Sequence, residues 1–149
     1  MEKLPQPIMS LLGEVGEKSV LIYLSIKAFE TKQFEVFKNI NEPGYDILFR
    51  NKETGARFKI EVKTRQRLYS TGEGDNFSFD VTDIEYTCCD VVICYWWERN
   101  LYFVVPKDKL YQTSSNGKSV YKLWVKPKVN GNLNDDILPY VNNWKILGI

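Results

Sequence analysis

The spacing of apolar residues near the start of the chain is typical of a long helix. Between residues 8 and 30, apolar positions recur at helical intervals and no proline interrupts them. The apolar positions that define this stripe are Val20, Leu21, Leu24 and Ala28. Gly13 and Gly16 weaken the first turns, so we expect the regular helix to begin near Gly16. Glu17 lies four residues before Leu21, which places a carboxylate at the edge of the apolar face.

A strand and a hairpin are expected next. Residues 33–40 are rich in aromatic and β-branched side chains and predict a strand. The turn cluster at 41–44 separates it from two further strand-like runs, residues 45–50 and 57–63. These two runs flank a polar turn that contains Gly55, which is typical of a β-hairpin.

The second half of the chain predicts a buried sheet. Residues 90–97 form an unbroken apolar run, as expected of a strand covered on both faces. The next strand, 101–106, ends at Pro106. The other expected elements are a loop over 68–76, short strands over 76–80 and 118–126, a short helix over 107–112, and a short helix and tail over 135–147. This order indicates an α/β fold with a central mixed sheet flanked by helices, in a single domain spanning residues 1–149.

The hairpin brings three charged residues together. If its turn is centred between Glu53 and Thr54, Asp46 falls opposite Glu61, and such neighbours have Cβ atoms about 4.5–5.5 Å apart. Alternation along the second strand places Lys63 on the same face as Glu61. The simplest alternative is a solvated hairpin face whose Glu–Lys pair contributes less than about 1 kcal/mol.

The same three residues are suited to phosphodiester hydrolysis. Asp46 and Glu61 can bind a hard divalent cation such as Mg²⁺ through oxygen, and the backbone carbonyl of Val62 can add a ligand. Such a metal activates a water molecule and neutralises charge that builds on the phosphate. Lys63 can hold the attacking water or stabilise the transition state, and a general-base role for it stays open.

Composition excludes several other chemistries. The 149-residue chain has no histidine, so His-based triads and His-metal sites are absent. Its three cysteines lack a C-x-x-C spacing, which argues against a zinc site or disulfides and favours a reducing compartment, the cytoplasm. We see no signal peptide and no membrane-length apolar run, and we expect no membrane association. The net charge is only +1, so any DNA-binding surface must gather its positive charge locally.

The stretch GYDILFRNKETGARFKIEVKTRQ resembles the PD-(D/E)xK (restriction-endonuclease-like) nuclease superfamily. This superfamily includes restriction enzymes, archaeal Holliday-junction resolvases and certain intron-encoded homing endonucleases. Asp46 matches the family's aspartate, Glu61 its second acidic residue and Lys63 its lysine. The later stretch YTCCDVVICYWWERNLYFVVPKDKL is similar to the strands that follow the motif, so the resemblance covers most of residues 10–110.

The resemblance assigns roles to further residues. Glu17, within GEKSVLIYL, looks like the glutamate that many members carry on the first helix and implies an assisting catalytic role. The alternatives are a helix-start carboxylate that interacts with the dipole, or Glu14 in the same role. Gln66 lies where some members place a supporting polar residue. The family's proline usually directly precedes the aspartate, whereas here Pro43 stands three residues earlier.

Basic residues next to this motif are the expected DNA contacts. Arg65 and Arg67 adjoin it and are expected to bind phosphates, with Gln66 beside them. Other lysines could bind phosphate or serve solubility alone: Lys59, Lys118, Lys122, Lys126 and Lys128.

The sequence therefore predicts a Mg²⁺-dependent endonuclease of double-stranded DNA, with Mn²⁺ as a possible substitute cofactor. The resemblance favours the homing branch, then a restriction enzyme, then a Holliday-junction resolvase. The rivals are a non-catalytic DNA-binding or assembly module of the same fold and an RNA-processing nuclease. Because a duplex has two strands to cut, we expect a homodimer or homotetramer.

Overall fold

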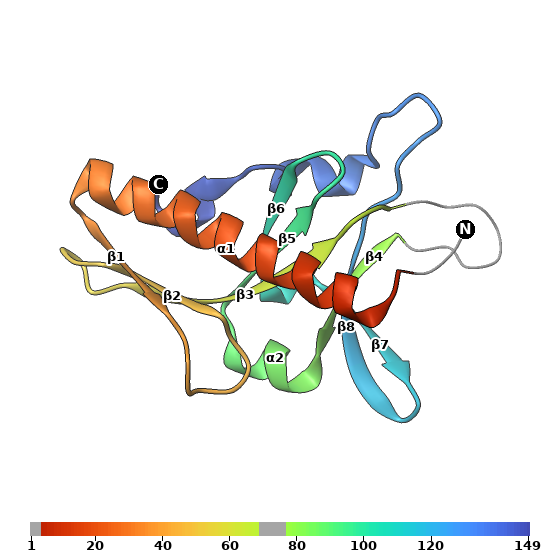
Figure 1. The fold of residues 1–149 in the computed structure, drawn as a ribbon, viewed down its shortest axis with the longest axis horizontal. Helices are drawn as coiled ribbons and strands as arrows, with labels where there is room; N and C mark the ends of the chain where they lie inside the picture. Colours follow the sequence, from red (N-terminus) through yellow and green to blue (C-terminus); the bar gives the residue numbers. More distant parts are fainter. Residues whose placement is uncertain (1–3, 69–76) are drawn as a thin grey trace.

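A five-stranded mixed sheet forms the centre of the protein (Figure 1). The computed structural model describes residues 4–68 and 77–149. The strands lie in the order β1 (Phe34–Lys38), β2 (Ile47–Asn51), β3 (Arg57–Arg65), β5 (Val91–Trp96) and β6 (Leu101–Pro106). Only the β3–β5 pair is parallel among these neighbours, and the other three pairs are antiparallel. The expected mixed sheet is confirmed.

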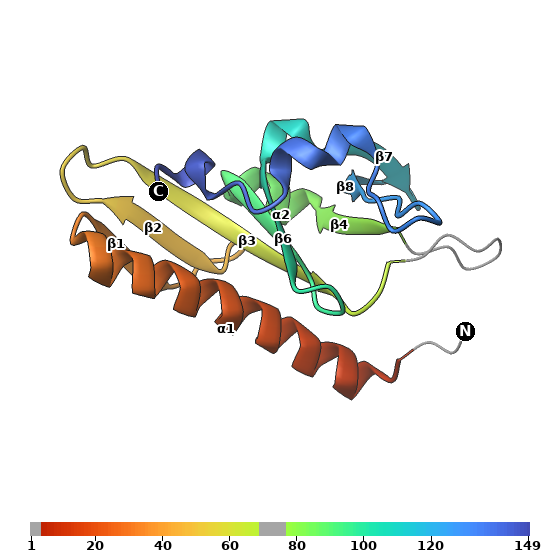
Figure 2. The same cartoon turned by 90° about the horizontal axis from the view of Figure 1, so that it is seen from above.

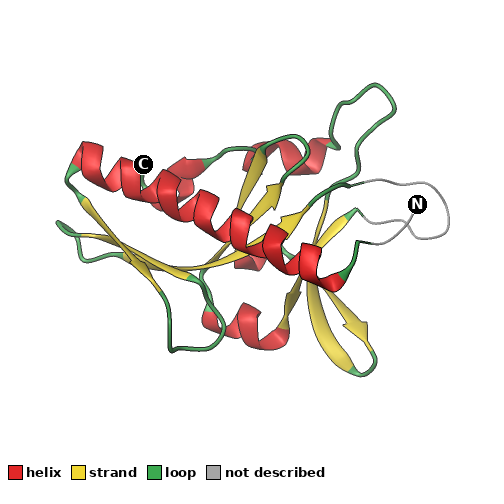
Figure 3. Cartoon of the chain, viewed as in Figure 1, coloured by secondary structure: helices red, strands yellow, loops and turns green. Residues whose placement is uncertain are grey.

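Helix α1 (Gln6–Thr31) lies across one face of this sheet (Figure 3). Its buried Val20 and Leu24 pack with Ile60 and Val62 of β3. The expectation that the regular helix begins near Gly16 was wrong, because α1 starts ten residues earlier, at Gln6. Prolines near its start suit a first turn, where backbone N–H groups have no helical acceptor.

A second layer covers the opposite face of the sheet, as Figure 2 shows. It contains a three-stranded antiparallel sheet in the order β4 (Ser78–Thr82), β8 (Lys118–Trp124) and β7 (Tyr111–Ser115), together with the short helix α2 (Asp83–Cys88). Phe79 and Leu123 of this layer are buried against Val92 and Phe103 of the central sheet. Every residue of β5 is buried, as the apolar run predicted.

Two parts of the sequence prediction need correction. The helix expected over 107–112 is a 3-10 turn, η1 (Lys107–Lys109), followed by strand β7. Asn116 and Gly117, both with positive φ, connect β7 to β8 in a tight hairpin turn, which suits an Asn-Gly pair. The sequence prediction also contained no element corresponding to α2.

The remaining predicted elements fit with small shifts. The strand expected over 33–40 ends at Lys38. The C-terminal segment forms two short 3-10 helices, η2 (Asp135–Tyr140) and η3 (Trp144–Leu147). Most of the loop expected over 68–76 lies outside the described residues. No helix in the described ranges is long and apolar enough to cross a membrane.

Candidate active site

The register of the β2–β3 hairpin places Asp46 beside Glu61. Ile47 pairs with Ile60, so Asp46, one residue earlier, falls opposite Glu61 as the sequence predicted. The backbone N–H of Asp46 donates to the carbonyl of Ile60 at 2.8 Å. Its side-chain Oδ2 accepts the N–H of Val62, also at 2.8 Å. Asp46 is therefore held at the end of the hairpin through both its backbone and its carboxylate.

The turn before Asp46 is ordered by one amide side chain and one glycine. Asn39 donates from Nδ2 to the carbonyls of Glu42 and Tyr45 and accepts the N–H of Glu42. Gly44 has a φ of +88°, and a Cβ at this position would lie 2.4 Å from Cβ of Cys88. The turn thus packs directly on α2, which links Asp46 to the second layer.

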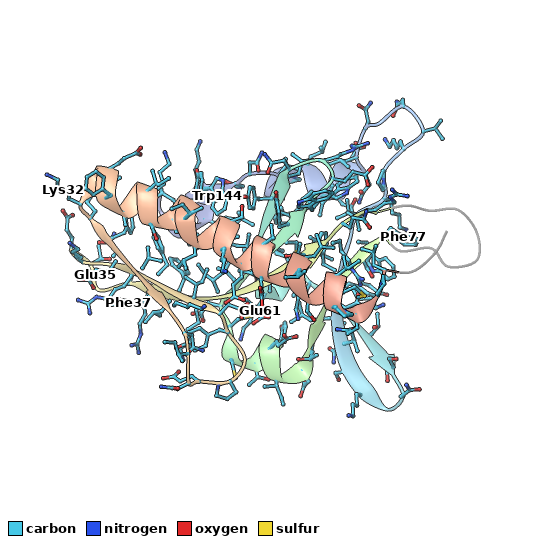
Figure 4. All side chains as sticks on the ribbon, in the orientation of Figure 1. Lys32, Glu35, Phe37, Glu61, Phe77 and Trp144 are labelled. Carbon is cyan, nitrogen blue, oxygen red and sulfur yellow. The ribbon has the colours of Figure 1, made fainter. Side chains whose placement is uncertain are left out.

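Glu61 and Lys63 meet α2 on the other side of the site. Glu61 is only 5% exposed, and Figure 4 shows its side chain between the ribbons of α1 and α2 in that view. The ammonium of Lys63 lies 3.5 Å from a carboxylate oxygen of Glu61 and 2.6 Å from one of Glu85. A chain of ionisable groups therefore runs from β3 to α2.

Glu85 is the member of this cluster that the sequence analysis missed. It is the third residue of α2, where its carboxylate accepts the backbone N–H of Thr82 while the hydroxyl of Thr82 accepts the N–H of Glu85. This reciprocal arrangement is a capping box, whose Ser/Thr-x-x-Glu pattern is legible in the sequence as Thr82–Glu85. That pattern was the available signal for both α2 and Glu85.

Burial, hydrogen bonds and neighbouring charges shift the ionisation of the site. Burial, followed by the charge of Asp46 and the hydrogen bond with Glu85, raises the pKa of Glu61 to about 9. Burial also raises the pKa of Asp46, although the N–H of Val62 opposes the shift. For Glu85 burial acts in the same direction, but hydrogen bonds with Glu61, Lys63 and the N–H of Thr82 outweigh it and lower its pKa to about 2.

Lys63 remains protonated in this cluster. Burial alone would lower its pKa, but the hydrogen bond and charge of Glu85, then the charges of Glu61 and Asp46, outweigh burial and raise it. A lysine held in this way is a fixed positive charge.

The donor set fits a hard divalent cation. Among the described residues, no three His, Cys, Asp or Glu side chains could hold a metal ion by themselves. Mg²⁺ does not need such a cage, because it is usually bound by one or two carboxylates and retains several waters. Asp46 and Glu61, with the carbonyl of Val62, provide such oxygen donors. Burial is the main cause that raises the pKa of both carboxyls, and a bound cation would favour their ionised forms.

Glu17 approaches the site from α1. Burial and then the charge of Asp46 raise the pKa of Glu17, so its carboxylate is close enough to sense that residue. It lines a shallow groove with Glu14, Lys18, Leu21 and Lys38. The structure thus brings Glu17 toward Asp46, while Glu14 lines the same groove and is exposed.

The three residues expected to contact DNA lie at the end of β3 and just beyond it. Nε of Arg65 donates to the carbonyl of Ser78 at 3.1 Å, and its guanidinium lies 4.0 Å from Asp80, so Arg65 joins β3 to β4. Arg67 is more exposed and lies 3.2 Å from Glu98. Gln66, which stands between the two arginines in the sequence, is partly buried. The structure therefore gives Arg65 a structural contact that the sequence did not predict.

The hairpin, the mixed sheet and α1 together make a restriction-endonuclease-like fold. Similar solved structures include the following two. A bacterial homing endonuclease, I-Ssp6803I, aligns over 93% of this chain and 89% of its own, with 20% sequence identity and a TM-score of 0.56. Archaeoglobus fulgidus Hjc, a Holliday junction resolvase from an archaeal hyperthermophile, aligns over 91% of this chain and 95% of its own, with 17% identity and a TM-score of 0.59.

These likenesses confirm the fold class that the sequence resemblance implied. No model of a protein family matches the chain, and no curated protein sequence matches it.

Proposed function

We propose that the protein is a metal-dependent endonuclease that hydrolyses phosphodiester bonds in double-stranded DNA. The observation that carries the proposal is the meeting of Asp46, Glu61 and Lys63 on one hairpin, where the buried carboxyl of Glu61 lies 3.5 Å from the Lys63 ammonium. The fold supports it, because two structural neighbours are, by name, a homing endonuclease and a Holliday junction resolvase.

Each residue of the cluster has a distinct role in this proposal. Asp46, Glu61 and the carbonyl of Val62 would hold Mg²⁺, or Mn²⁺ in its place, and the bound cation would supply an activated water and neutralise phosphate charge. Lys63 contributes a fixed ammonium beside the scissile phosphate. Its raised pKa supports electrostatic stabilisation and water positioning over a general-base role.

Two further carboxylates support this centre. Glu85 holds the Lys63 ammonium at 2.6 Å and so acts as a positioning residue. Glu17 reaches the same region from α1 and assists near Asp46. Arg67, with Gln66, follows the end of β3 and would contact DNA phosphates, and Arg65 joins β4 to β3 through the carbonyl of Ser78.

The specificity we infer is site-specific cleavage of the homing or restriction type by a homodimer or homotetramer. A duplex has two strands, and a symmetric assembly places one active site on each of them. Junction resolution is the second candidate, favoured by the TM-score of 0.59 with the resolvase Hjc.

A cleavage panel tests the proposal. Purified protein with Mg²⁺ is incubated with plasmid, genomic DNA, a four-way junction and RNA, beside a chelator control. We expect fragments from DNA, and a loss of at least about 100-fold for Lys63→Ala, in line with the removal of a charge that stabilises a transition state. Lys52→Ala, which changes an exposed lysine in the hairpin turn, is the matched control and should cut normally.

The substrate cut distinguishes the candidates. Discrete duplex fragments indicate a site-specific enzyme, whereas selective cutting of the four-way junction indicates a resolvase. If no nucleic acid is cut, or if Lys63→Ala cuts as well as the wild type, the proposed active site is wrong and a binding module of this fold becomes the better description.

A further inference from the structure

The outward side of α1 carries two groups of three exposed apolar side chains, separated at the middle by Lys18 and Ser19. Their members are Ile8, Leu11, Val15, Ile22, Ile26 and Phe29, which are between 45% and 82% exposed. At about 100° per residue, all six project within an arc of roughly 60°. This arc lies opposite Gly16, Val20 and Leu24, the residues that α1 buries against the sheet. We call these six side chains the outer stripe.

No described element covers the outer stripe. In Figure 2, α1 forms the outermost layer of the molecule, and the sheet and second layer both lie on its other side. At about 150 Å² for a fully exposed apolar side chain, the stripe presents on the order of 500 Å². That is near the upper end of the apolar patches that monomeric proteins expose, and patches of this size are often interaction sites.

The order of the stripe is symmetric along the helix. Ile8 and Phe29, Leu11 and Ile26, and Val15 and Ile22 are three pairs with one shared midpoint, between residues 18 and 19. A two-fold axis that lies beside the stripe, perpendicular to α1 and level with this midpoint, would therefore place every apolar residue of the stripe opposite an apolar residue of the second copy. An isologous interface requires this kind of self-complementarity, because each residue must fit the surface from which it came.

We propose that the outer stripe is a homodimer interface in which α1 pairs antiparallel with α1 of a second copy. The stripe spans about 32 Å of helix, and two copies would cover on the order of 1,000 Å², the lower bound for a specific interface.

This interface specifies the surface for the self-association in the proposed function, but it does not depend on nuclease activity. Oligomeric state is measured without nucleic acid, so a monomeric protein that still cuts DNA would refute the interface and the proposed assembly but leave the proposed nuclease activity in place. An inactive protein that dimerises would refute the proposed function alone.

Paired charge substitutions test the interface and its orientation. Sedimentation velocity of the wild-type protein should show a dimer or a larger even-numbered assembly. Val15→Glu alone and Ile22→Lys alone should each raise the dissociation constant at least tenfold. The double variant should recover association, because antiparallel pairing sets the introduced glutamate of one copy against the introduced lysine of the other. Val129→Lys, at an exposed apolar residue outside the stripe, is the control and should associate as the wild type does.

Three results would overturn the proposal. The first is a wild-type protein that stays monomeric up to about 100 µM, well above the range of typical specific complexes. The second is that the single variants associate as the wild type does. The third is a double variant that remains dissociated. The last result would indicate parallel pairing, which places like charges against each other. Circular dichroism of each variant verifies that α1 is intact, and we expect no change because both positions are exposed.

Discussion

Helices α1 and α2 both bring a glutamate to the central strand β3, and they do so by opposite means. α1 is 26 residues long and buries Gly16, Val20 and Leu24 against the sheet. α2 has six residues and buries none of them. Its position depends on its capping box and on the ion pair between Glu85 and Lys63. It also depends on the stacking of Tyr86 on Tyr121, whose ring centroids are 3.6 Å apart.

This difference separates two tasks within the site. α1 is fixed by hydrophobic burial, which is large and insensitive to small changes of charge. α2 is fixed by hydrogen bonds and charge, each contributing roughly 0.5–3 kcal/mol. We therefore expect substitutions in α1 to act first on stability and substitutions in α2 to act first on the position of Lys63.

The contact between α1 and β3 gives the largest expected effect. A Cβ added at Gly16 would lie 1.8 Å from Oγ1 and 3.0 Å from Cβ of Thr64, so Gly16→Ala forces the helix away from β3. We expect a loss of about 2–3 kcal/mol in the free energy of unfolding, the usual cost of overpacking. Urea denaturation measures it.

Gly13→Ala is the matched control for this effect. Nothing lies within 4 Å of a Cβ added at Gly13, so alanine there should stabilise α1 by about 0.5–1 kcal/mol through helix propensity. Combining Gly16→Ala with Thr64→Ala should recover much of the loss. If Gly13→Ala and Gly16→Ala changed the free energy of unfolding equally, close packing against Thr64 would not be what fixes α1.

The same contrast explains which parts of the structure could be predicted from the sequence. The helical periodicity of apolar residues was sufficient to predict that a helix precedes the sheet. The alternation of residues around the hairpin turn was sufficient to predict the register that sets Asp46 opposite Glu61. A six-residue helix has too few positions for either pattern, so α2 could be found only from its capping box at Thr82.

Tertiary context determined what the sequence pattern missed. Strand β7 was mistaken for a helix because its strand character depends on pairing with β8 across the Asn116–Gly117 turn. The contact of Glu85 with Lys63 joins residues 22 positions apart, and no local pattern reports such a distance. The two arginines were expected beside the site because they follow Lys63 in the sequence, but the bond from Arg65 to β4 depends on the fold of the second layer.

Substitutions of Glu85 and Glu17 give the next largest expected effect, which is on the rate of cleavage. Glu85→Gln removes the charge that holds Lys63 and should lower cleavage about tenfold, or about 1.4 kcal/mol in transition-state free energy. Glu17→Gln, which lacks a direct contact with Lys63 in the described structure, should lower it only about threefold. Initial cleavage rates under saturating Mg²⁺ measure both.

The pH profile distinguishes positioning from a loss of folding. Glu85 raises the pKa of Lys63, so Glu85→Gln lowers that pKa. If the Lys63 ammonium is needed, the alkaline limb of the rate profile moves to lower pH in Glu85→Gln and stays in place in Glu17→Gln. Equal profiles in the two variants would contradict the positioning role of Glu85.

The smallest expected effect concerns the capping box itself. Thr82→Ala removes the hydroxyl that accepts the N–H of Glu85, and such a change usually costs about 1 kcal/mol. Because α2 buries no residue, the loss should appear as local opening: amide hydrogen exchange over residues 83–88 should accelerate about fivefold, while exchange in the buried part of α1 stays unchanged. Thr87→Ala, which removes only a bond to the carbonyl of Asp83 within α2, is the control and should leave exchange near the wild-type rate. If Thr82→Ala accelerated exchange in both helices equally, α2 would share the hydrophobic support of α1, and the division of tasks between the two helices would fail.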